Sequence, residues 1–305
     1  MAFIIERKKG ITIYYELVET VRENGKVKHK MLKYFGSKKE MLDYCKRHKI
    51  KPPKHEESLL DKATAAKLEK KLAKLNLLRP LPENALKSLK KKFEVEMTYN
   101  SNAIEGNRLS LKETYLVLEK GMTIGGKSVR EHLEATNHRD AILLLEKIAD
   151  KRAKITELDV LNLHAIVLDK IDPQNAGFYR REQVYITQSK HVPPKHKDVP
   201  KLMAAVISEI NSTAEGAKAV ESAVKVHFMI AWIHPFIDGN GRLARLLSNL
   251  RLMRAGFPPV VLQRKIRKTY YDALEKADED DLKPLAQIIA RDAEKALDLY
   301  IGSAG

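Results

Sequence analysis

The residues best suited to chemistry lie close together, in one short segment between two apolar stretches of the chain. They are His234, Asp238, Gly239, Asn240, Gly241, Arg242 and Arg245. Glycine and asparagine tolerate positive φ angles, so the backbone N–H groups of such a turn can converge on an anion. A helix that begins at this turn adds partial positive charge. The segment therefore predicts a phosphate site at a helix N-terminus.

Charged and titratable side chains surround this predicted phosphate site. Arg242 and Arg245 are three residues apart and share a helix face, so two guanidinium groups can bind further phosphate oxygens. This spacing favours a polyphosphate over a single phosphate. Asp238 offers the oxygen ligand that Mg²⁺ takes together with nucleotide phosphates. His234, with an ordinary pKa of about 6.5, can accept a hydroxyl proton at neutral pH.

Taken singly, these side chains have ordinary explanations. A lone histidine is more often a buried structural residue, and a lone arginine more often forms a surface ion pair. The segment as a whole could be a simple turn between two helices. The combination of base, carboxylate, glycine turn and paired arginines within twelve residues is what favours a catalytic interpretation.

The segment HPFIDGNGRLAR resembles the signature of the Fic family, His-x-Phe-x-(Asp/Glu)-Gly-Asn-Gly-Arg-x-x-Arg, at every specified position. The resemblance implies that His234 deprotonates a target hydroxyl and that Asp238 holds Mg²⁺. It also implies that residues 239–242 bind the α- and β-phosphates, that Arg245 binds the γ-phosphate, and that Phe236 anchors the loop. Arg242 is expected to stabilise the charge that develops during transfer.

The resemblance implies a protein adenylyltransferase that moves AMP from ATP to a Ser, Thr or Tyr hydroxyl of a target protein. Removal of AMP from a modified target, or transfer from another nucleotide, are the alternatives in this class. Because Arg245 is present, the resemblance favours a triphosphate held for AMP donation. Relatives also suggest a homodimer.

A helix expected over residues 83–105 ends in Ser101-Asn102-Ala103-Ile104-Glu105-Gly106. This run resembles the inhibitory motif (Ser/Thr)-x-x-x-Glu-(Gly/Asn) of Fic proteins whose brake precedes the catalytic region. The resemblance implies that Glu105 pairs with Arg245 and competes with the γ-phosphate. The alternative is a surface charge at a helix end, but a carboxylate near a helix C-terminus opposes the helix dipole and needs a partner.

Two further segments resemble binding surfaces of the family. Residues 178–192 carry β-favouring side chains, and a short hairpin or flap is expected there, with Val184, Tyr185 and Ile186 as candidates for contacting the target. Tyr270 and Tyr271 resemble the aromatic border of the adenine pocket. Close relatives carry an asparagine where this chain has Asp278. An ordinary surface hairpin and ordinary core tyrosines are the alternatives.

The elements that must position these residues are mostly helices. We expect a mainly α protein, a Fic-type helical bundle with a short β-hairpin flap, preceded by a small α+β N-terminal region. Ser110 with Glu113 and Ser128 with Glu131 are capping boxes that predict helix starts. Pro80 and Pro82 suggest a boundary, dividing the chain into a basic region 1–80 and a Fic domain 81–305 that contains the inhibitory helix and the catalytic loop 234–245.

Within region 1–80, residues 11–35 are rich in Ile, Val, Thr and Tyr and are interrupted by Asn24-Gly25, which predicts a β-hairpin. Ser37 and Glu40 form a capping box that predicts a helix, which Pro52-Pro53 would end. Residues 59–78, built largely of Lys, Ala and Leu, predict a basic amphipathic helix.

Charge is spread unevenly. Of the net +16, residues 1–92 hold 25 Lys and Arg against 11 Asp and Glu, and the rest of the chain holds 31 against 29. A basic leader attracts polyanions, so a second hypothesis is an ATP-responsive regulator that binds nucleic acid through residues 1–80; a solvated face is the simpler alternative. The single cysteine, Cys45, excludes an internal disulfide, and no apolar run suggests a signal peptide or membrane span. We expect a cytoplasmic protein.

Overall fold

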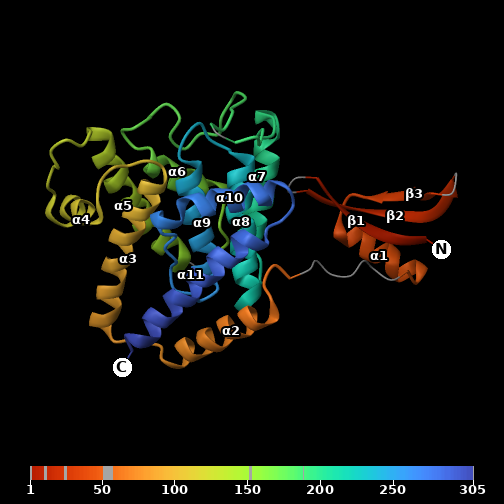
Figure 1. Cartoon of the computed structure of the whole chain (residues 1–305), viewed down its shortest axis with the longest axis horizontal. Coiled ribbons are helices and arrows are strands. Elements are labelled where there is room, and N and C mark those ends of the chain that lie inside the picture. Colours follow the sequence, from red (N-terminus) through yellow and green to blue (C-terminus); the bar gives the residue numbers. More distant parts are fainter. Residues whose placement is uncertain are drawn as a thin grey trace. The chain divides into compact units, whose positions relative to one another are not determined.

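The computed structural model describes residues 2–9, 12–23, 26–50, 58–150, 153–187 and 189–304. The chain divides into two compact units, Met1–Ser58 and Leu59–Gly305. Both are shown in Figure 1, coloured along the sequence. The second unit contains every residue of the predicted chemical site.

The first unit is a three-stranded antiparallel sheet with one helix. Its strands are β1 (Ala2–Lys9), β2 (Thr12–Glu23) and β3 (Lys26–Phe35), in the order β1-β2-β3, and α1 (Lys38–His48) follows. The β2–β3 pairing confirms the hairpin predicted over residues 11–35, although Asn24-Gly25 and Pro52-Pro53 lie outside the described residues. Ser37 caps α1 as predicted. A small core, which includes Tyr15, Phe35 and Cys45, joins sheet and helix.

The described part of the second unit is helical. Its helices are α2 (Lys62–Leu77), α3 (Glu83–Ile104), α4 (Leu111–Lys120), α5 (Val129–Asp150), α6 (Glu157–Val167), α7 (Val199–Ile210), α8 (Gly216–Ile233), α9 (Asn240–Arg254), α10 (Arg267–Asp278) and α11 (Lys283–Gly302). Both predicted capping boxes form, because Ser110 and Glu113 at α4, and Ser128 and Glu131 before α5, exchange side-chain and backbone hydrogen bonds. The predicted helical bundle is confirmed.

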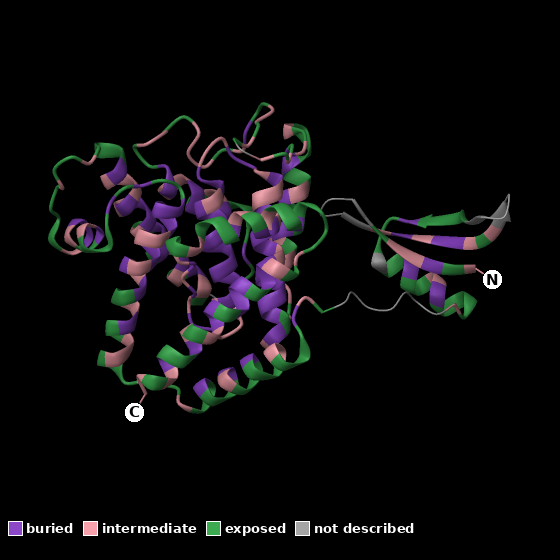
Figure 2. Cartoon of the chain, in the orientation of Figure 1, coloured by how far each residue is buried: buried purple, intermediate pink, exposed green. Residues whose placement is uncertain are grey.

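Helices α8 and α9 form the centre of this bundle. Most of their residues are buried, as Figure 2 shows, and they pack against each other and against α5, α7 and α11. Helix α8 is apolar around most of its surface and must be covered on all sides, whereas α9 also buries polar side chains, among them Arg242, Arg245 and Arg251. The connection between them, residues 234–239, is thereby fixed at both of its ends.

The division between units falls earlier in the chain than the boundary expected at residues 80–81. Helix α2 packs on α8 and α11 and buries Leu68, Leu72 and Leu75. Its Lys71 Nζ lies 2.7 Å from Glu294 and 2.6 Å from Asp298 on α11. The prolines that suggested a boundary therefore only separate α2 from α3 within one unit.

The segment expected to form a hairpin flap is an ordered loop. Among its described residues, 178–187 and 189–192, no strand is formed. Side chains satisfy the loop's backbone instead: Arg180 Nη1 donates to Glu182 O at 2.9 Å and Gln183 Nε2 donates to Pro193 O at 2.8 Å. A ladder of strand hydrogen bonds is not needed to hold the loop. No helix in the described part of the chain is long and apolar enough to cross a membrane.

Candidate active site

The connection between α8 and α9 is a tight turn closed by a side chain. His234 ends α8 with φ 48°, and Gly239, with φ 80°, directly precedes α9. Asn240 Oδ1 accepts a hydrogen bond from the Phe236 N–H at 3.0 Å, and Asn240 Nδ2 donates to Phe236 O at 2.9 Å. Phe236 is fully buried. The turn is therefore anchored from inside, and its backbone directs the N-terminus of α9 outward, where an anion can bind.

His164, on α6, supports the turn from below. Its ring stacks on Phe236 with centroids 3.5 Å apart. The Gly177 N–H donates to His164 Nδ1 at 3.0 Å, so Nε2 carries the proton and donates to Asp238 O at 3.0 Å. Burial lowers the pKa of His164 to about 4, which keeps the ring neutral. Sequence reasoning missed this residue, because no local pattern links position 164 to position 238.

His234 is a buried imidazole that lines a cavity. Burial, aided by the positive charge of Arg180, lowers its pKa to about 4, so it is a neutral base at neutral pH. Its Nδ1 is buried, and the backbone at Ala231 acts against this lowering of the pKa. Arg180 fixes the backbone here, because its Nε donates to His234 O at 2.8 Å and its N–H to Pro235 O at 2.9 Å. Arg180 is a second supporting residue that sequence reasoning did not single out.

Asp238 lies at the mouth of the turn between two arginines. Its carboxylate is 2.7 Å from Arg130 Nη2 and 3.3 Å from Arg242 Nη2. It also accepts the Gly239 N–H at 2.6 Å. Burial by itself opposes ionisation, but Arg242, the Gly239 N–H and Arg130 together hold the pKa of Asp238 below its ordinary value. The side chain remains 41% exposed, so an ion arriving from solvent can reach the carboxylate.

Arg242 and Arg245 both lie at the start of α9, as the spacing predicted, and both are buried. The Nε and Nη1 atoms of Arg242 have no hydrogen-bond partner among the described residues. The Nη1 atom also lies 4.0 Å from Glu134 Oε1, beyond hydrogen-bonding distance. Buried N–H donors of a cation that lack hydrogen-bond acceptors favour an incoming anion.

Arg245 is held by the end of α3. Its Nε donates to Ser101 Oγ at 2.9 Å, and its Nη2 donates to Ser101 O at 2.9 Å and to Glu105 Oε1 at 2.7 Å. The same carboxylate lies directly against the turn, because a Cβ placed on Gly241 would be 2.2 Å from Glu105 Oε1. A side chain 140 residues upstream in the chain thus covers both an arginine and the backbone of the predicted phosphate site.

A cavity of about 470 Å³ opens beside the turn. Glu105, His234 and Gly241 line it on one side, and Tyr270 and Tyr271 of α10 line it on the other, together with Ile186 and Asp278. Tyr270 is almost fully buried and its hydroxyl lies 2.8 Å from His227 Nε2, whereas Tyr271 packs under the guanidinium of Arg267. Burial raises the pKa of both tyrosines, so both hydroxyls stay protonated.

The predicted flap residues are divided between two environments. Ile186 lines the cavity, Val184 is half-buried, and Tyr185 is 77% exposed. His191, further along the same loop, also lines the cavity, and its Nδ1 lies 3.7 Å from Asp278. Burial raises the pKa of Asp278, and the nearby His191 opposes this.

The residues at the turn are compatible with Mg²⁺ but do not form a complete protein cage. Among the described residues, no three His, Cys, Asp or Glu side chains converge to hold a metal ion. Mg²⁺ at nucleotide sites needs only one or two carboxylates besides phosphate oxygens and water, and Asp238 can supply one. The fold and the site together define a helical protein with a neutral imidazole beside a turn whose backbone and arginines could bind an anion.

Comparisons with known proteins match two segments of the chain to different families. The pattern of the Fic/DOC family matches residues 154–252, and that of the IS1634 family transposase N-terminal domain matches residues 4–74. The protein adenylyltransferase Fic of Drosophila willistoni is 39% identical over 243 residues, 79% of this chain and 48% of that protein. That of Aedes aegypti is 38% identical over 262 residues, 82% of this chain and 52% of that protein. The chain spans about half the length of these curated relatives.

Solved structures of Fic proteins resemble this chain as well. Fic-1 of C. elegans superposes with a TM-score of 0.70 at 33% identity, covering 80% of this chain and 72% of that one. A Fic domain containing signaling protein of Bacteroides thetaiotaomicron superposes with a TM-score of 0.71 at 27% identity, covering 78% of this chain and 96% of that one. The chain therefore belongs to the Fic/DOC family.

Proposed function

We propose that the second unit is a protein adenylyltransferase that moves AMP from ATP to a hydroxyl of a target protein, and that Glu105 holds it inhibited. The observation that carries this proposal is the position of the Glu105 carboxylate, 2.7 Å from Arg245 Nη2 and against Gly241. A buried arginine and a helix N-terminus are the two groups that would bind a polyphosphate, and one carboxylate pairs with the arginine and lies against Gly241 in the first turn of that helix.

In this proposal the turn binds the phosphates and His234 acts as the base. The imidazole takes the proton from a Ser, Thr or Tyr hydroxyl, and the oxygen bonds to the α-phosphorus while the bond to the β-phosphate oxygen breaks. AMP becomes attached to the target, and pyrophosphate leaves. Arg242 and the N–H groups at the start of α9 stabilise the charge on the phosphate oxygens. The aromatic side chains across the cavity, Tyr270 and Tyr271, are proposed to border the base.

Asp238 is the residue that would hold Mg²⁺. When bound, Mg²⁺ would neutralise phosphate charge during transfer. Arg130 and Arg242 now neutralise the Asp238 carboxylate, so they would exchange this partner for phosphate oxygens when nucleotide binds.

The brake acts through the populations of two states. While Glu105 occupies Arg245, the γ-phosphate has no guanidinium partner, and ATP cannot take the productive position. If the closed state holds about 99% of molecules, the productive affinity falls about a hundredfold.

The test is to remove the carboxylate. We expect Glu105→Gly to raise incorporation of label from α-³²P-ATP, into the protein itself or an added acceptor, at least about tenfold. Glu83→Gly, at the opposite end of α3, is the matched control and should behave as wild type. Adding His234→Ala to Glu105→Gly should abolish labelling but leave ATP binding. Equal labelling by the single and double variants would refute the catalytic role of His234, and no gain from Glu105→Gly would refute the brake.

We further propose that the first unit binds nucleic acid. Two observations support this proposal: the match of residues 4–74 to a transposase N-terminal domain, and the basic side chains of β3. Lys28 and Lys30 are exposed on this strand, which also carries the exposed Tyr34, whereas Lys33 lies with its Nζ over the rings of Phe35 and Tyr44. Lysines bind phosphates, and an exposed aromatic ring can stack on a base.

This second proposal predicts a strong salt dependence. Binding of a DNA or RNA duplex to the full chain, measured by fluorescence anisotropy, should weaken roughly tenfold or more between 50 and 200 mM salt. A chain of residues 59–305 should not bind. Equal affinity of the full and shortened chains would place any nucleic-acid contact outside the first unit.

A further inference from the structure

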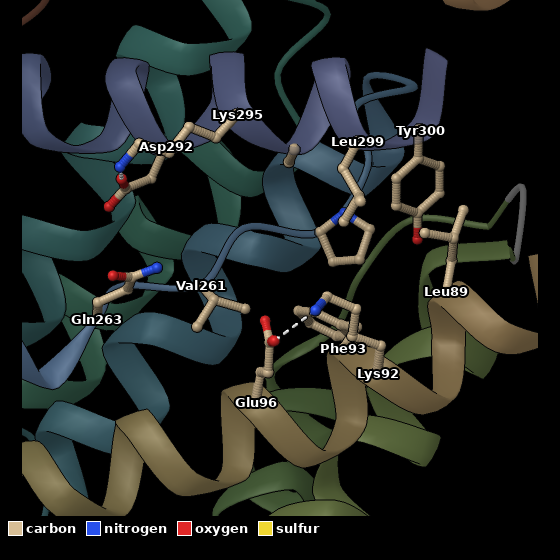
Figure 3. Close-up of a pocket in the computed structure, with 12 residues that line it drawn as sticks. Leu89, Lys92, Phe93, Glu96, Val261, Gln263, Asp292, Lys295, Leu299 and Tyr300 are labelled. Atoms are coloured by element: carbon tan, nitrogen blue, oxygen red, sulfur yellow. Dashed lines mark hydrogen bonds and ion pairs between the residues drawn. The ribbon is translucent and has the colours of Figure 1, made fainter. Parts of the chain in front are cut away.

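Outside the cavity of the proposed active site, the helical unit has a second hollow, between α3, the segment 259–263 and α11 (Figure 3). Its volume is about 170 Å³, and both of its lysines are already paired. Lys92 lies 2.8 Å from Glu96, and Lys295 lies 2.8 Å from Asp292. This hollow therefore offers no unpaired charged side chain to a ligand. A more unusual surface belongs to the sheet unit.

The sheet of the first unit has one face that no helix of this unit covers, in the part of the chain that the structure describes. Helix α1 covers the opposite face, whose side chains form the small core: Ile4, Tyr15, Leu17 and Phe35. Neighbouring residues of a strand point to opposite faces of a sheet. Three aromatic residues that each directly precede one of these core residues therefore lie on the uncovered face. They are Phe3, Tyr14 and Tyr34.

The rings on the uncovered face form two pairs that join different strands. Phe3 lies edge-on to His29 with ring centroids 5.4 Å apart, and Tyr14 lies beside Tyr34 at 5.5 Å. We call these four side chains the aromatic face. Tyr34 is 53% exposed and Phe3 is 37% exposed. Each pair thus presents a ring to solvent.

The aromatic face is less polar than the solvent side of a sheet usually is. An antiparallel sheet that packs one face on a core normally carries polar side chains on the other. Here β3 is exposed along much of its length (Figure 2), and its Met31, which faces Val18 beside Phe3, is 56% exposed. Adjoining exposed apolar side chains mark a surface that contacts a partner.

The charge of this unit is complementary to a polyanion. Residues 1–58 hold 15 Lys and Arg against 8 Asp and Glu. Lys30 is exposed on β3, and Arg7 on β1 keeps 49% of its side chain exposed, although it lies 3.3 Å from Glu16. Because β1 and β3 are the two edge strands, cationic side chains lie on both sides of the rings. The edges can bind phosphates, and the rings can stack on bases.

We propose that the aromatic face binds single-stranded nucleic acid, with unpaired bases stacked on Tyr34 and Phe3 and phosphates bound by the basic edge strands. This inference rests on the proposed nucleic-acid binding of the first unit, and it names the form of nucleic acid and the face that contacts it. The bases of a duplex are already stacked on one another, so they are not available to the rings. A duplex contacts only the basic side chains.

The preference is tested with a fluorescent strand of about 12 nucleotides, a length within the usual range of single-strand sites, and with the same strand annealed to its complement. Anisotropy with the full chain should show that the single strand binds at least about tenfold more tightly than the duplex. Strands of DNA and of RNA should both bind, because the faces of the bases and the phosphates are common to them.

Substitutions separate stacking from charge. Tyr34→Ala should weaken binding of the single strand at least about fivefold and leave duplex binding unchanged, because it removes a ring and no charge. Tyr34→Phe keeps the ring and should bind as wild type. Lys30→Ala should weaken binding of both forms and lower the slope of log affinity against log salt by about 1. Tyr115→Ala, at an exposed tyrosine on α4 of the helical unit, is the control and should change neither.

Two results would overturn this inference while the proposed nucleic-acid binding stands: a single strand that binds no more tightly than the duplex, or wild-type affinity of Tyr34→Ala for the single strand. If neither form binds, the proposed nucleic-acid binding itself fails. Self-association of the chain that Tyr34→Ala abolishes, measured by analytical ultracentrifugation, would show that a second copy covers the aromatic face, and would overturn the inference too. The comparison of the two forms on wild type decides the question even if Tyr34→Ala fails to fold.

Discussion

Two histidines on either side of the turn are kept neutral for different purposes. His164 uses both ring nitrogens, accepting from Gly177 and donating to Asp238 O, so it has no capacity left for catalysis. His234 lines the cavity, and its Nδ1 is buried, which leaves Nε2 as the nitrogen for the proposed proton transfer. Burial lowers the pKa of each to about 4. The same shift therefore serves structure at one residue and a proposed base at the other.

The lowered pKa of His234 predicts the acid limb of the pH profile. Only the neutral imidazole accepts a proton, so transfer by Glu105→Gly at saturating ATP should not lose its base between pH 7.5 and about 5.5. The rate should fall by half near pH 4, where the pKa of about 4 lies. Single-turnover rates across this range, with circular dichroism to verify folding, provide the measurement. A midpoint at the ordinary value of about 6.5 would show that solvent reaches the ring.

At the level of elements, α8 and α9 are joined by a turn whose shape depends on one amide. Asn240 bonds both backbone groups of Phe236, and these groups are buried with the ring. Without the amide, a buried N–H and a buried C=O would lose their partners. The start of α9 is thus held in place by its own first residue.

We expect Asn240→Ala to lower the free energy of unfolding by about 2–4 kcal/mol, because two buried backbone groups become unsatisfied. Chemical denaturation of the 59–305 chain measures this value. Asn175→Ala serves as a control, since that side chain makes one partly buried bond to Asp172 and should cost about 1 kcal/mol. Equal losses from the two substitutions would mean that the amide of Asn240 is not the support of the turn.

For the whole molecule, the division into units determines which fragments can fold. Helix α2 belongs to the helical unit through Leu68, Leu72 and Leu75 and through the ion pairs of Lys71 with α11. The match to a transposase N-terminal domain, residues 4–74, runs past the division at Ser58 and into this helix. The sheet unit and α2 therefore share one family match but belong to different cores.

Truncation tests this assignment. A chain of residues 59–305 should unfold cooperatively at nearly the temperature of the helical unit in the full chain. A chain of residues 81–305 exposes the surfaces of α8 and α11 that α2 covers. Its free energy of unfolding should be lower by roughly 5 kcal/mol, because three buried leucines are missing. Differential scanning calorimetry of the two fragments distinguishes them. Equal stability would show that α2 is dispensable to this core.

Much of the local chemistry could be predicted from residue types. Short-range rules of φ, capping and hydrogen bonding predict four of these features. They are the turn within residues 234–245, the end of α3 after Ile104, the capping boxes, and the hairpin over residues 11–35. Each depends on a local signal, which for the hairpin is the Asn24-Gly25 pair between its strands. The pairing of Glu105 with Arg245 was expected from a resemblance to a motif, and in the structure Glu105 Oε1 lies 2.7 Å from Arg245 Nη2.

Contacts between distant segments were beyond such rules. How the helices pack decides four such features. They are the stacking of His164 on Phe236, the hydrogen bond of Arg180 to the backbone of His234, the packing of α2 on α8 and α11, and the carboxylate oxygen of Asp292 that has no hydrogen-bond partner among the described residues. The flap carries β-favouring side chains yet forms no strand in its described part, because Arg180 and Gln183 already bond its backbone. Propensity acts over a few residues, whereas burial and partner choice are settled only when the whole core closes.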